Sequence, residues 1–426
     1  MRRLSALIPL LLLAGFCRAE TVRVGLFTLF RPKTVTFEVR ESGGYDLLHE
    51  GAFLARWLAP SGEKLQVTFS PEQQRLRFLS RGGEIVSLQV KPAMEVAIFP
   101  REKETVLAVA VPGGVKHTYR GNFSVLVSAE NYLTPVVSLD LEEYVTSVVA
   151  AELPEKSPPE LLKAQAVVTR SYALATAGRH RYFDFCDLTH CQVFQGFFSE
   201  RILPNVRKAV QETASLVLSD GSRIIPGYYT GCCSGWTATP QLIWDRAETD
   251  GFRQVECRHE ENCRWKHWKR TLSLETLGRI FPEARPEELA SLTIAERSSV
   301  GDYVRTINCG TQYLSGEEFR RRLCQQHNWN SLPGLSFSLC LTQAGWELEG
   351  AGLGHGIGLC QAGAAWLARQ GQSFPSILKY YFPDLTCRSA GSFPLNGSRR
   401  FGGNIIDNPV NPFNFTYQTP GQSVQK

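Results

Sequence analysis

The sequence contains no apolar run long enough to cross a membrane. Its N-terminal apolar stretch, residues 4–16, has 13 residues, whereas a transmembrane helix needs about 20. Two arginines precede this stretch and "CRAET" follows it, which is the pattern of a secretion signal cleaved after Ala19. We therefore expect residues 1–19 to be removed, the mature protein to be secreted or held in the cell envelope, and no transmembrane segment to remain.

The chain also lacks a strong charge of either sign. Its formal net charge is +5, and the loss of Arg2, Arg3 and Arg18 with the signal lowers this to about +2. Nucleic acids and anionic membranes are bound by clustered basic surfaces. The charge of the mature chain therefore favours neither of them as a partner.

Cysteine, in contrast, is plentiful: the sequence has 12, of which 11 follow residue 19. In an exported chain this number predicts an oxidising compartment and several disulfides. Because the number is odd, at least one cysteine is free, metal-bound or paired between chains. Cys232 and Cys233 are adjacent, so we expect each to bond elsewhere rather than to its neighbour.

The first part of the mature chain has the pattern of β-strands and no catalytic grouping. In residues 20–130, short runs with β-branched residues, such as "TVTFEV" and "LQVTFS", alternate with turns such as "SRGGE" and "VPGG". We interpret this region as a structural or binding β-domain.

Helical and strand patterns mix in the rest of the chain. Residues 131–390 are expected to form an α+β domain, and "LSLETLGRIF", "YVRTINC" and "SGEEFRRRL" predict an inserted subdomain at about 265–335. Residues 391–426 are rich in Gly, Asn, Pro and Ser, which predicts a loose C-terminal tail. The predicted fold class is therefore α+β.

Two helices joined by a tight elbow are predicted near residue 154. The capping pattern "DLEE" at 140–143 begins the first helix, and Pro154 ends it. The pattern "SPPE" at 157–160 begins the second helix, with Ser157 as its expected cap, and Gly178 is expected to terminate it.

Glu152 lies in the last turn of the first predicted helix, where the helix dipole disfavours a negative charge. Apolar neighbours and the like charge of Glu155 are expected to raise its pKa further. A carboxyl group that is protonated near neutral pH is suited to general acid catalysis. The alternative is a solvated glutamate at a frayed helix end, which the position alone favours.

Three further motifs have chemical potential. "CDLTHC" places Cys186, His190 and Cys191 in one short loop, where they could bind Zn²⁺ or form disulfides. "GHGIG" surrounds His355 with glycines that allow close backbone approach. "CRWKHWKR" interleaves Lys266 with tryptophans, which suits an acidic sugar, although core tryptophans between solvated charges are the more frequent explanation of such a run.

Four stretches carry a resemblance to a known family. They are "LEEYVTSVVAAELPEKSPPELLKAQAVVTRSYAL", "DLTHCQVFQG", "YYTGCCSGWTA" and "GHGIGLCQAGAAWLARQGQSFPSILKYYFPD". In this order they resemble the stage II sporulation protein D (SpoIID) and amidase-enhancer family of peptidoglycan-acting proteins, over roughly residues 131–387.

The resemblance implies site residues. Glu152 matches the family's catalytic acid and Arg170 an arginine considered essential, expected to orient Glu152 or the sugar. The other positions expected to bind substrate are Gln165, Tyr172, Gln192, Ser234, Gly235, Trp236, Lys266, His355 and Gln361. Some family members bind zinc in the "CDLTHC" loop, which makes Cys186 and His190 the expected ligands. Trp236 replaces a family glycine, and it either stacks on sugar rings or narrows the cleft.

The implied activity is that of a lytic transglycosylase acting on peptidoglycan glycan strands stripped of their stem peptides. Such an enzyme cleaves the MurNAc–GlcNAc bond and forms 1,6-anhydro-MurNAc, so a single carboxyl group suffices. Two alternatives stay open: a non-catalytic peptidoglycan-binding module that stimulates a cell-wall amidase, and a zinc amidase that uses the "CDLTHC" loop.

Overall fold

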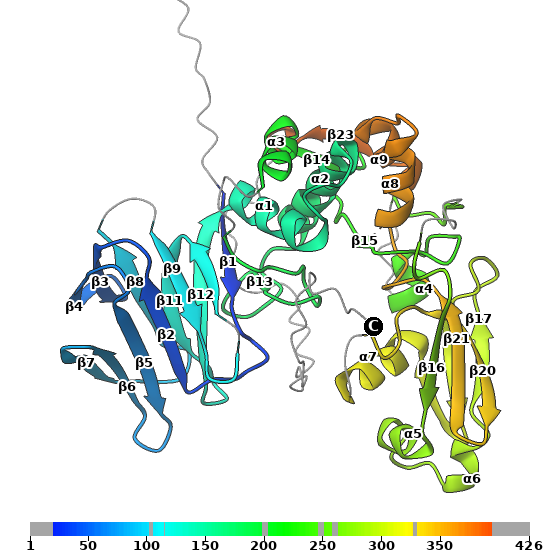
Figure 1. Ribbon diagram of the computed structural model, residues 1–426, viewed down its shortest axis with the longest axis horizontal. Coiled ribbons are helices and arrows are strands. Elements are labelled where there is room, and N and C mark those ends of the chain that lie inside the picture. The colour runs from blue at the N-terminus through cyan, green and yellow to red at the C-terminus, as the bar shows by residue number, and fades with distance from the viewer. Residues whose placement is uncertain are drawn as a thin grey trace, which may run out of the picture.

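The computed structural model describes residues 20–101, 105–114, 116–197, 203–245, 251–257, 263–326 and 330–393 (Figure 1). The predicted signal peptide (1–19) and most of the predicted tail (391–426) lie outside these residues. Within the described ranges, several sheets stand beside numerous helices, so the predicted α+β class is confirmed.

The larger sheet of the N-terminal region has the strand order β13-β1-β12-β11-β8-β3-β4. Its strands are β1 (Thr21–Gly25), β3 (Gly43–His49), β4 (Ala52–Ala59), β8 (Glu95–Pro100), β11 (Asn122–Val127), β12 (Leu133–Asp140) and β13 (Phe185–Cys186). β12 pairs with β1 in antiparallel register, Val24 opposite Val137, and then runs directly into the first helix. The short β13 adds to the other side of β1 in parallel, so the later "CDLTHC" loop is attached to this sheet.

A second sheet covers the first in the order β10-β9-β2-β5-β6-β7. Its strands are β2 (Thr34–Val39), β5 (Lys64–Ser70), β6 (Arg75–Ser80), β7 (Gly83–Gln89), β9 (Val106–Ala110) and β10 (His117–Arg120). In β2 every second side chain is buried (Val35, Phe37 and Val39), because successive residues of a strand point to opposite faces. Phe37 meets Phe123 of the first sheet with ring centroids 6.1 Å apart, which places the core between the sheets.

The predicted elbow is formed by α1 (Leu141–Glu152) and α2 (Pro159–Thr176). Asp140 caps α1 as expected, since its carboxylate accepts a hydrogen bond from the backbone N–H of Glu142 at 2.8 Å. Ser157 does not cap α2: Pro158 occupies that position, and no side chain makes a capping hydrogen bond there. Gly178, with a φ of +82°, follows the end of α2 as predicted.

Helix α2 is the centre of the helical layer at the top of Figure 1. It contacts α1, α3 (Pro204–Glu212), α8 (Gln361–Arg369) and α9 (Phe374–Tyr381). Two small sheets each join segments that are distant in the sequence. They pair β14 (Leu216–Ser219) with β23 (Thr386–Ser389), and β15 (Tyr229–Thr230) with β22 (Leu359–Cys360).

The inserted region has a core of its own that extends from Trp268 to Leu348. It contains the sheets β16-β21-β20 and β17-β18-β19 and is joined to the rest near the short α4 (Pro240–Trp244). Its elements are β16 (Trp268–Leu272), α5 (Leu274–Ile280), α6 (Pro286–Leu289), β17 (Thr293–Arg297), β18 (Val304–Cys309), β19 (Gln312–Ser315), α7 (Gly316–Gln326), β20 (Ser336–Thr342) and β21 (Gly345–Ala351). Because β20 and β21 complete the first of these sheets, this unit continues beyond the predicted residue 335.

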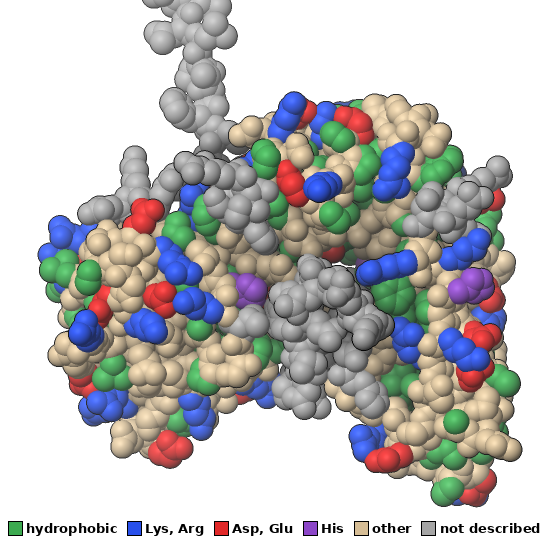
Figure 2. Space-filling model, viewed as in Figure 1, with side chains coloured by type: hydrophobic (Ala, Val, Ile, Leu, Met, Phe, Trp, Pro, Cys, Tyr) green, Lys and Arg blue, Asp and Glu red, His purple; other side chains and the backbone are tan. Residues whose placement is uncertain are grey.

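Among the described residues, no helix combines the length and the apolar character that a membrane crossing requires. On the face shown in Figure 2, basic and acidic side chains are interspersed rather than gathered into one basic patch.

Candidate functional site

Glu152 is the last residue of α1, and its carboxyl group is held by groups from distant parts of the chain. The hydroxyl of Tyr229, in β15, donates a hydrogen bond to Glu152 Oε1 at 3.1 Å. The backbone N–H of Val193 and the side chain of Gln361 also hydrogen-bond to this carboxyl group. Each of these four residues is half-buried.

Burial around the carboxyl group raises the pKa of Glu152 from 4.5 to about 7, although the hydrogen bonds from Tyr229, Val193 and Gln361 lower it. The pKa of Glu152 is raised, as the sequence predicted, but one of the expected causes of this shift does not apply. Glu155 does not act on Glu152: its carboxylate accepts a hydrogen bond from the backbone N–H of Asn205 at 2.8 Å, at the start of α3. Glu152 is therefore an acid whose protonated form persists to near-neutral pH.

Gln361 connects Glu152 to the interior. It begins α8, directly after β22, and its amide donates to Gln165 Oε1 at 3.3 Å. The pairing of β15 with β22, Tyr229 opposite Leu359, sets the two Glu152 partners beside each other. The first and last family stretches thus meet at one carboxyl group.

Three of the residues expected to bind substrate lie in the protein interior. Gln165 is fully buried and Tyr172 and Gln192 almost fully. The hydroxyl of Tyr144 donates to Gln192 Oε1 at 3.2 Å, and Arg179 donates to the hydroxyl of Tyr172. A glycan strand does not reach these side chains without a rearrangement, so their place is beneath the site.

Arg170 is not beside Glu152, which corrects the expectation that it orients the acid or the sugar. Its side chain is fully buried and forms a two-pronged ion pair with Glu142, with Nε–Oε1 and Nη2–Oε2 distances of 2.8 and 2.6 Å. Its third hydrogen bond goes to the carbonyl of Leu216 at 3.0 Å. Arg170 joins α2, the start of α1 and β14, which gives it a structural role.

His355 lies against aromatic rings, its ring centroid 5.1 Å from that of Trp244. Its Nδ1 accepts a hydrogen bond from the backbone N–H of Ile357 at 3.0 Å. Burial lowers the pKa of His355 to about 3. The imidazole is therefore neutral and shapes the glycine-rich loop rather than transferring protons at physiological pH.

The remaining predicted residues lie toward the inserted unit. Ser234 donates to the carbonyl of Gly301 at 3.1 Å, and Gly235 has a φ of +95°, which favours glycine. Trp236 is 36% exposed and therefore accessible for stacking. Lys266 is exposed, while the nearby Trp268 is a core residue of the inserted unit, which agrees with the more frequent explanation of "CRWKHWKR" as core tryptophans between solvated charges.

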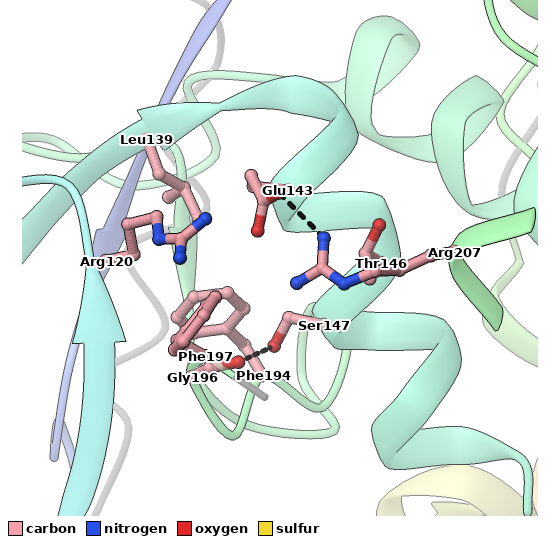
Figure 3. A pocket seen from close by; sticks show the side chains of 9 residues that line it. All are labelled: Arg120, Leu139, Glu143, Thr146, Ser147, Phe194, Gly196, Phe197 and Arg207. Atoms are coloured by element: carbon pink, nitrogen blue, oxygen red, sulfur yellow. Dashed lines mark hydrogen bonds and ion pairs between the residues drawn. The ribbon is translucent and has the colours of Figure 1, made fainter. Parts of the chain in front are cut away.

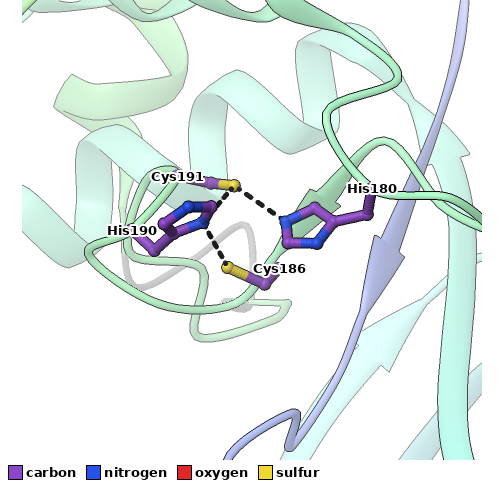
Figure 4. A group of neighbouring side chains, drawn as sticks. All are labelled: His180, Cys186, His190 and Cys191. Atoms are coloured by element: carbon purple, nitrogen blue, oxygen red, sulfur yellow. Dashed lines mark hydrogen bonds between the residues drawn. The ribbon is translucent and has the colours of Figure 1, made fainter. Parts of the chain in front are cut away.

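The "CDLTHC" loop forms part of a four-residue cluster with His180, Cys186, His190 and Cys191 (Figure 4). One ligand atom from each lies within 4.8 Å of all the others. His180 Nε2 is 3.3 Å from Cys191 Sγ, and His190 Nδ1 is 3.7 Å from Cys186 Sγ. Sequence reasoning missed His180, although it lies only six residues before Cys186, in the loop that follows α2.

The cluster is fixed to the N-terminal sheet. Asp187, next to Cys186, accepts hydrogen bonds from the backbone N–H of Phe27 at 2.7 Å and from Thr28 Oγ1 at 3.2 Å. Burial opposes ionisation of Cys191, yet hydrogen bonds from Cys186 and the two histidines lower the pKa of its thiol well below the ordinary value. Two thiols and two imidazoles at these distances are a suitable donor set for Zn²⁺.

A small pocket, partly open to solvent, lies between the N-terminal sheets and α1 (Figure 3). Arg207 pairs with Glu143 at 2.9 Å on one side, and the Arg120 guanidinium lies over the Phe197 ring on the other. The pocket is lined by neither Glu152 nor any other predicted site residue.

Comparison with known proteins agrees with the motifs. Residues 129–219 match the family model described as Stage II sporulation protein. An uncharacterised protein of Brachyspira hyodysenteriae is 28% identical over 261 residues, 58% of this chain and 66% of that protein. Stage II sporulation protein D of Bacillus amyloliquefaciens is 25% identical over 283 residues, 61% of this chain and 77% of that protein. The amidase enhancer of Bacillus subtilis is 23% identical over 291 residues, 57% of this chain and 40% of that protein.

These similarities agree with the resemblance to the stage II sporulation protein D family that the motifs predicted. The matched segment includes Glu152 and both helices of the elbow.

Proposed function

We propose that this protein is an exported lytic transglycosylase that acts on peptidoglycan glycan strands. The observation that carries the proposal is the state of Glu152: a half-buried residue whose carboxyl group has a pKa of about 7. The groups that contact it, from Tyr229, Val193 and Gln361, are all neutral. A hydrolysing glycosidase uses a second carboxylate, which either activates a water molecule or attacks the sugar carbon. When a hydroxyl group of the substrate itself attacks that carbon, a single carboxyl group suffices.

In the proposed reaction, protonated Glu152 donates its proton to the oxygen between C1 of MurNAc and GlcNAc. The C1–O bond breaks, and the C6 hydroxyl of the same MurNAc attacks C1 to form the 1,6-anhydro ring. The C6 hydroxyl proton passes to the Glu152 carboxylate, which restores the acid. Tyr229 and Gln361 keep the carboxyl group oriented through both proton transfers.

The test uses the mature protein on amidase-treated peptidoglycan, with mass spectrometry of the soluble fragments. Fragments lighter than the hydrolysis product by one water, ending in 1,6-anhydro-MurNAc, support the proposal. Reducing ends without the anhydro ring contradict it.

The second candidate is a non-catalytic module that binds peptidoglycan and stimulates a cell-wall amidase. The relative named amidase enhancer favours it, and that relative is matched over only 40% of its length. This candidate predicts glycan binding and amidase stimulation that survive the loss of Glu152.

We propose that His180, Cys186, His190 and Cys191 bind a structural Zn²⁺. Four protein ligands fill the tetrahedral site that Zn²⁺ prefers, whereas a catalytic zinc keeps one position open for water. The donor set therefore favours a metal that holds the loop next to Val193 over a zinc amidase centre.

His180→Ala is expected to lower the zinc content by one ion per chain and to reduce the melting temperature, because the metal then has only three ligands. Zinc is measured by elemental analysis and stability by thermal unfolding. His267→Ala, at an exposed position, is the control and should change neither. Unchanged zinc in the His180 variant would exclude this residue as a ligand.

Tyr229→Phe is expected to move the pH profile of the reaction upward. The Tyr229 hydrogen bond lowers the pKa of Glu152, so its removal raises that pKa. The acid must be protonated, so kcat/KM for the wild type falls above pH 7, and for the variant at a higher pH. Tyr313→Phe, at a 63% exposed position, should leave the profile in place. If the pH profile of Tyr229→Phe is identical to that of the wild type, the ionisation of Glu152 does not cause the fall of kcat/KM at high pH.

A further inference from the structure

A second cluster of metal-binding side chains lies apart from the "CDLTHC" loop. Cys233, Cys257 and Cys360 are buried, and their three Sγ atoms lie within 4.8 Å of one another. They come from three separate segments: the loop after β15, the segment 251–257, and the junction of β22 with α8. Cys232, the neighbour of Cys233, is already bonded to Cys263.

The spacing of the sulfur atoms suits a single metal ion. Three sulfurs bound to one Zn²⁺ at about 2.3 Å lie about 4 Å from one another, which is within the observed limit. Thiolates select soft ions such as Cu⁺ and Zn²⁺ over hard ones. Each of the three segments would supply one ligand.

Two hydrogen-bonding groups are directed at these sulfur atoms. The backbone N–H of Cys233 donates to Cys360 Sγ at 3.3 Å. The hydroxyl of Tyr381, a buried residue of α9, lies 3.1 Å from Cys257 Sγ and can donate to it. Such donors stabilise the negative charge of metal-bound thiolates and orient them.

We propose that Cys233, Cys257 and Cys360 form a three-thiolate site for a thiophilic d¹⁰ cation, Zn²⁺ or Cu⁺. Binding replaces the three thiol protons, which are released to solvent, by three sulfur–metal bonds, and no electron is transferred. The ion would join the loop after β15 to Cys360, the residue before Gln361. It would thereby hold two partners of Glu152, Tyr229 and Gln361, in register, but the proposal does not depend on the transglycosylase activity.

The experiment is native mass spectrometry of the full mature chain, reduced under anaerobic conditions and titrated separately with Zn²⁺ and with Cu⁺. Cys186→Ser removes a ligand of the first cluster, and Cys257→Ser removes a ligand of the second. We expect Cys186→Ser to retain one tightly bound ion, which is the ion of the second cluster. Cys257→Ser is expected to lose this second-cluster ion. Cys340→Ser, at an exposed cysteine, is the matched control and should bind as the wild type does.

Cys257→Ser would also lose the ion if it failed to fold. A second measurement therefore uses Cys186→Ser, in which the second cluster is intact. In Cys186→Ser, bound Co²⁺ should give sulfur-to-metal charge-transfer absorption with the intensity of three thiolates, and bound metal should protect Cys257 from alkylation. Retention of either Zn²⁺ or Cu⁺ supports the proposal, and the competing titrations show which ion is preferred. A metal-free Cys186→Ser variant overturns it, as does a disulfide between two of the three cysteines in protein purified without reductant.

Discussion

Glu152→Gln is expected to abolish the release of 1,6-anhydro fragments and, at the same time, to stabilise the folded protein above pH 7. Glutamine cannot donate the proton that the leaving oxygen needs, and general acid catalysis contributes about 10²–10⁴-fold to a rate. It nevertheless keeps the shape of the side chain and can accept the hydrogen bond from Tyr229.

The effect on stability follows from the raised pKa. The unfolded chain ionises Glu152 near pH 4.5, whereas the folded protein does so near pH 7. The folded protein thus holds more protons between these values, so its free energy of unfolding falls as pH rises from 4.5 to 7 and stays lower above pH 7. A shift of one pKa unit corresponds to about 1.4 kcal/mol, so Glu152→Gln is expected to increase the free energy of unfolding by up to about 3 kcal/mol above pH 7 and not to change it below about pH 4.

Both parts are measured on the same preparations: fragments by mass spectrometry, and stability by denaturant unfolding at pH 4, 6 and 8. Glu275→Gln, at a 77% exposed glutamate of the inserted unit, is the control and should change neither. Anhydro fragments released by the Glu152 variant would remove this residue from catalysis. If the wild type makes no fragments but both proteins bind glycan, the amidase-stimulating module becomes the function.

Glu142→Ala is expected to destabilise the protein by about 3–5 kcal/mol, and more than Arg170→Met does. The Arg170 side chain is fully buried, whereas that of Glu142 is 37% exposed. Removing the carboxylate leaves a buried cation with only the Leu216 carbonyl as a partner in the described contacts. Removing the arginine leaves a carboxylate that water can reach. Arg170→Met is therefore expected to lose less stability than Glu142→Ala.

A double-mutant cycle with denaturant unfolding measures this asymmetry. The double variant Glu142→Ala/Arg170→Met should be more stable than Glu142→Ala alone, and Glu349→Ala, at a 59% exposed position, is the control. Activity per folded molecule should persist in Arg170→Met, because Arg170 does not contact Glu152. A folded Arg170→Met variant without activity would restore the catalytic role that the family resemblance implied.

The sequence was sufficient for features that depend on neighbouring residues. Asp140 and Pro154 delimit α1, and Gly178 follows α2, because caps, prolines and helical periodicity act within a few residues. The alternating pattern of strands such as β2 likewise predicted the β-rich region, since one face of a half-buried strand must be apolar. The position of Glu152 at a helix end was visible for the same reason.

Contacts between distant segments were decided only by the tertiary structure. The pKa of Glu152 depends on burial and on Tyr229 and Gln361, which lie far along the chain and meet it through the pairing of β15 with β22. The Arg170–Glu142 ion pair and the approach of His180 to the cysteine loop arise in the same way. Short-range patterns specify which helices and strands form, but the packing of those elements sets the surroundings of each side chain, and hence its charge and chemistry.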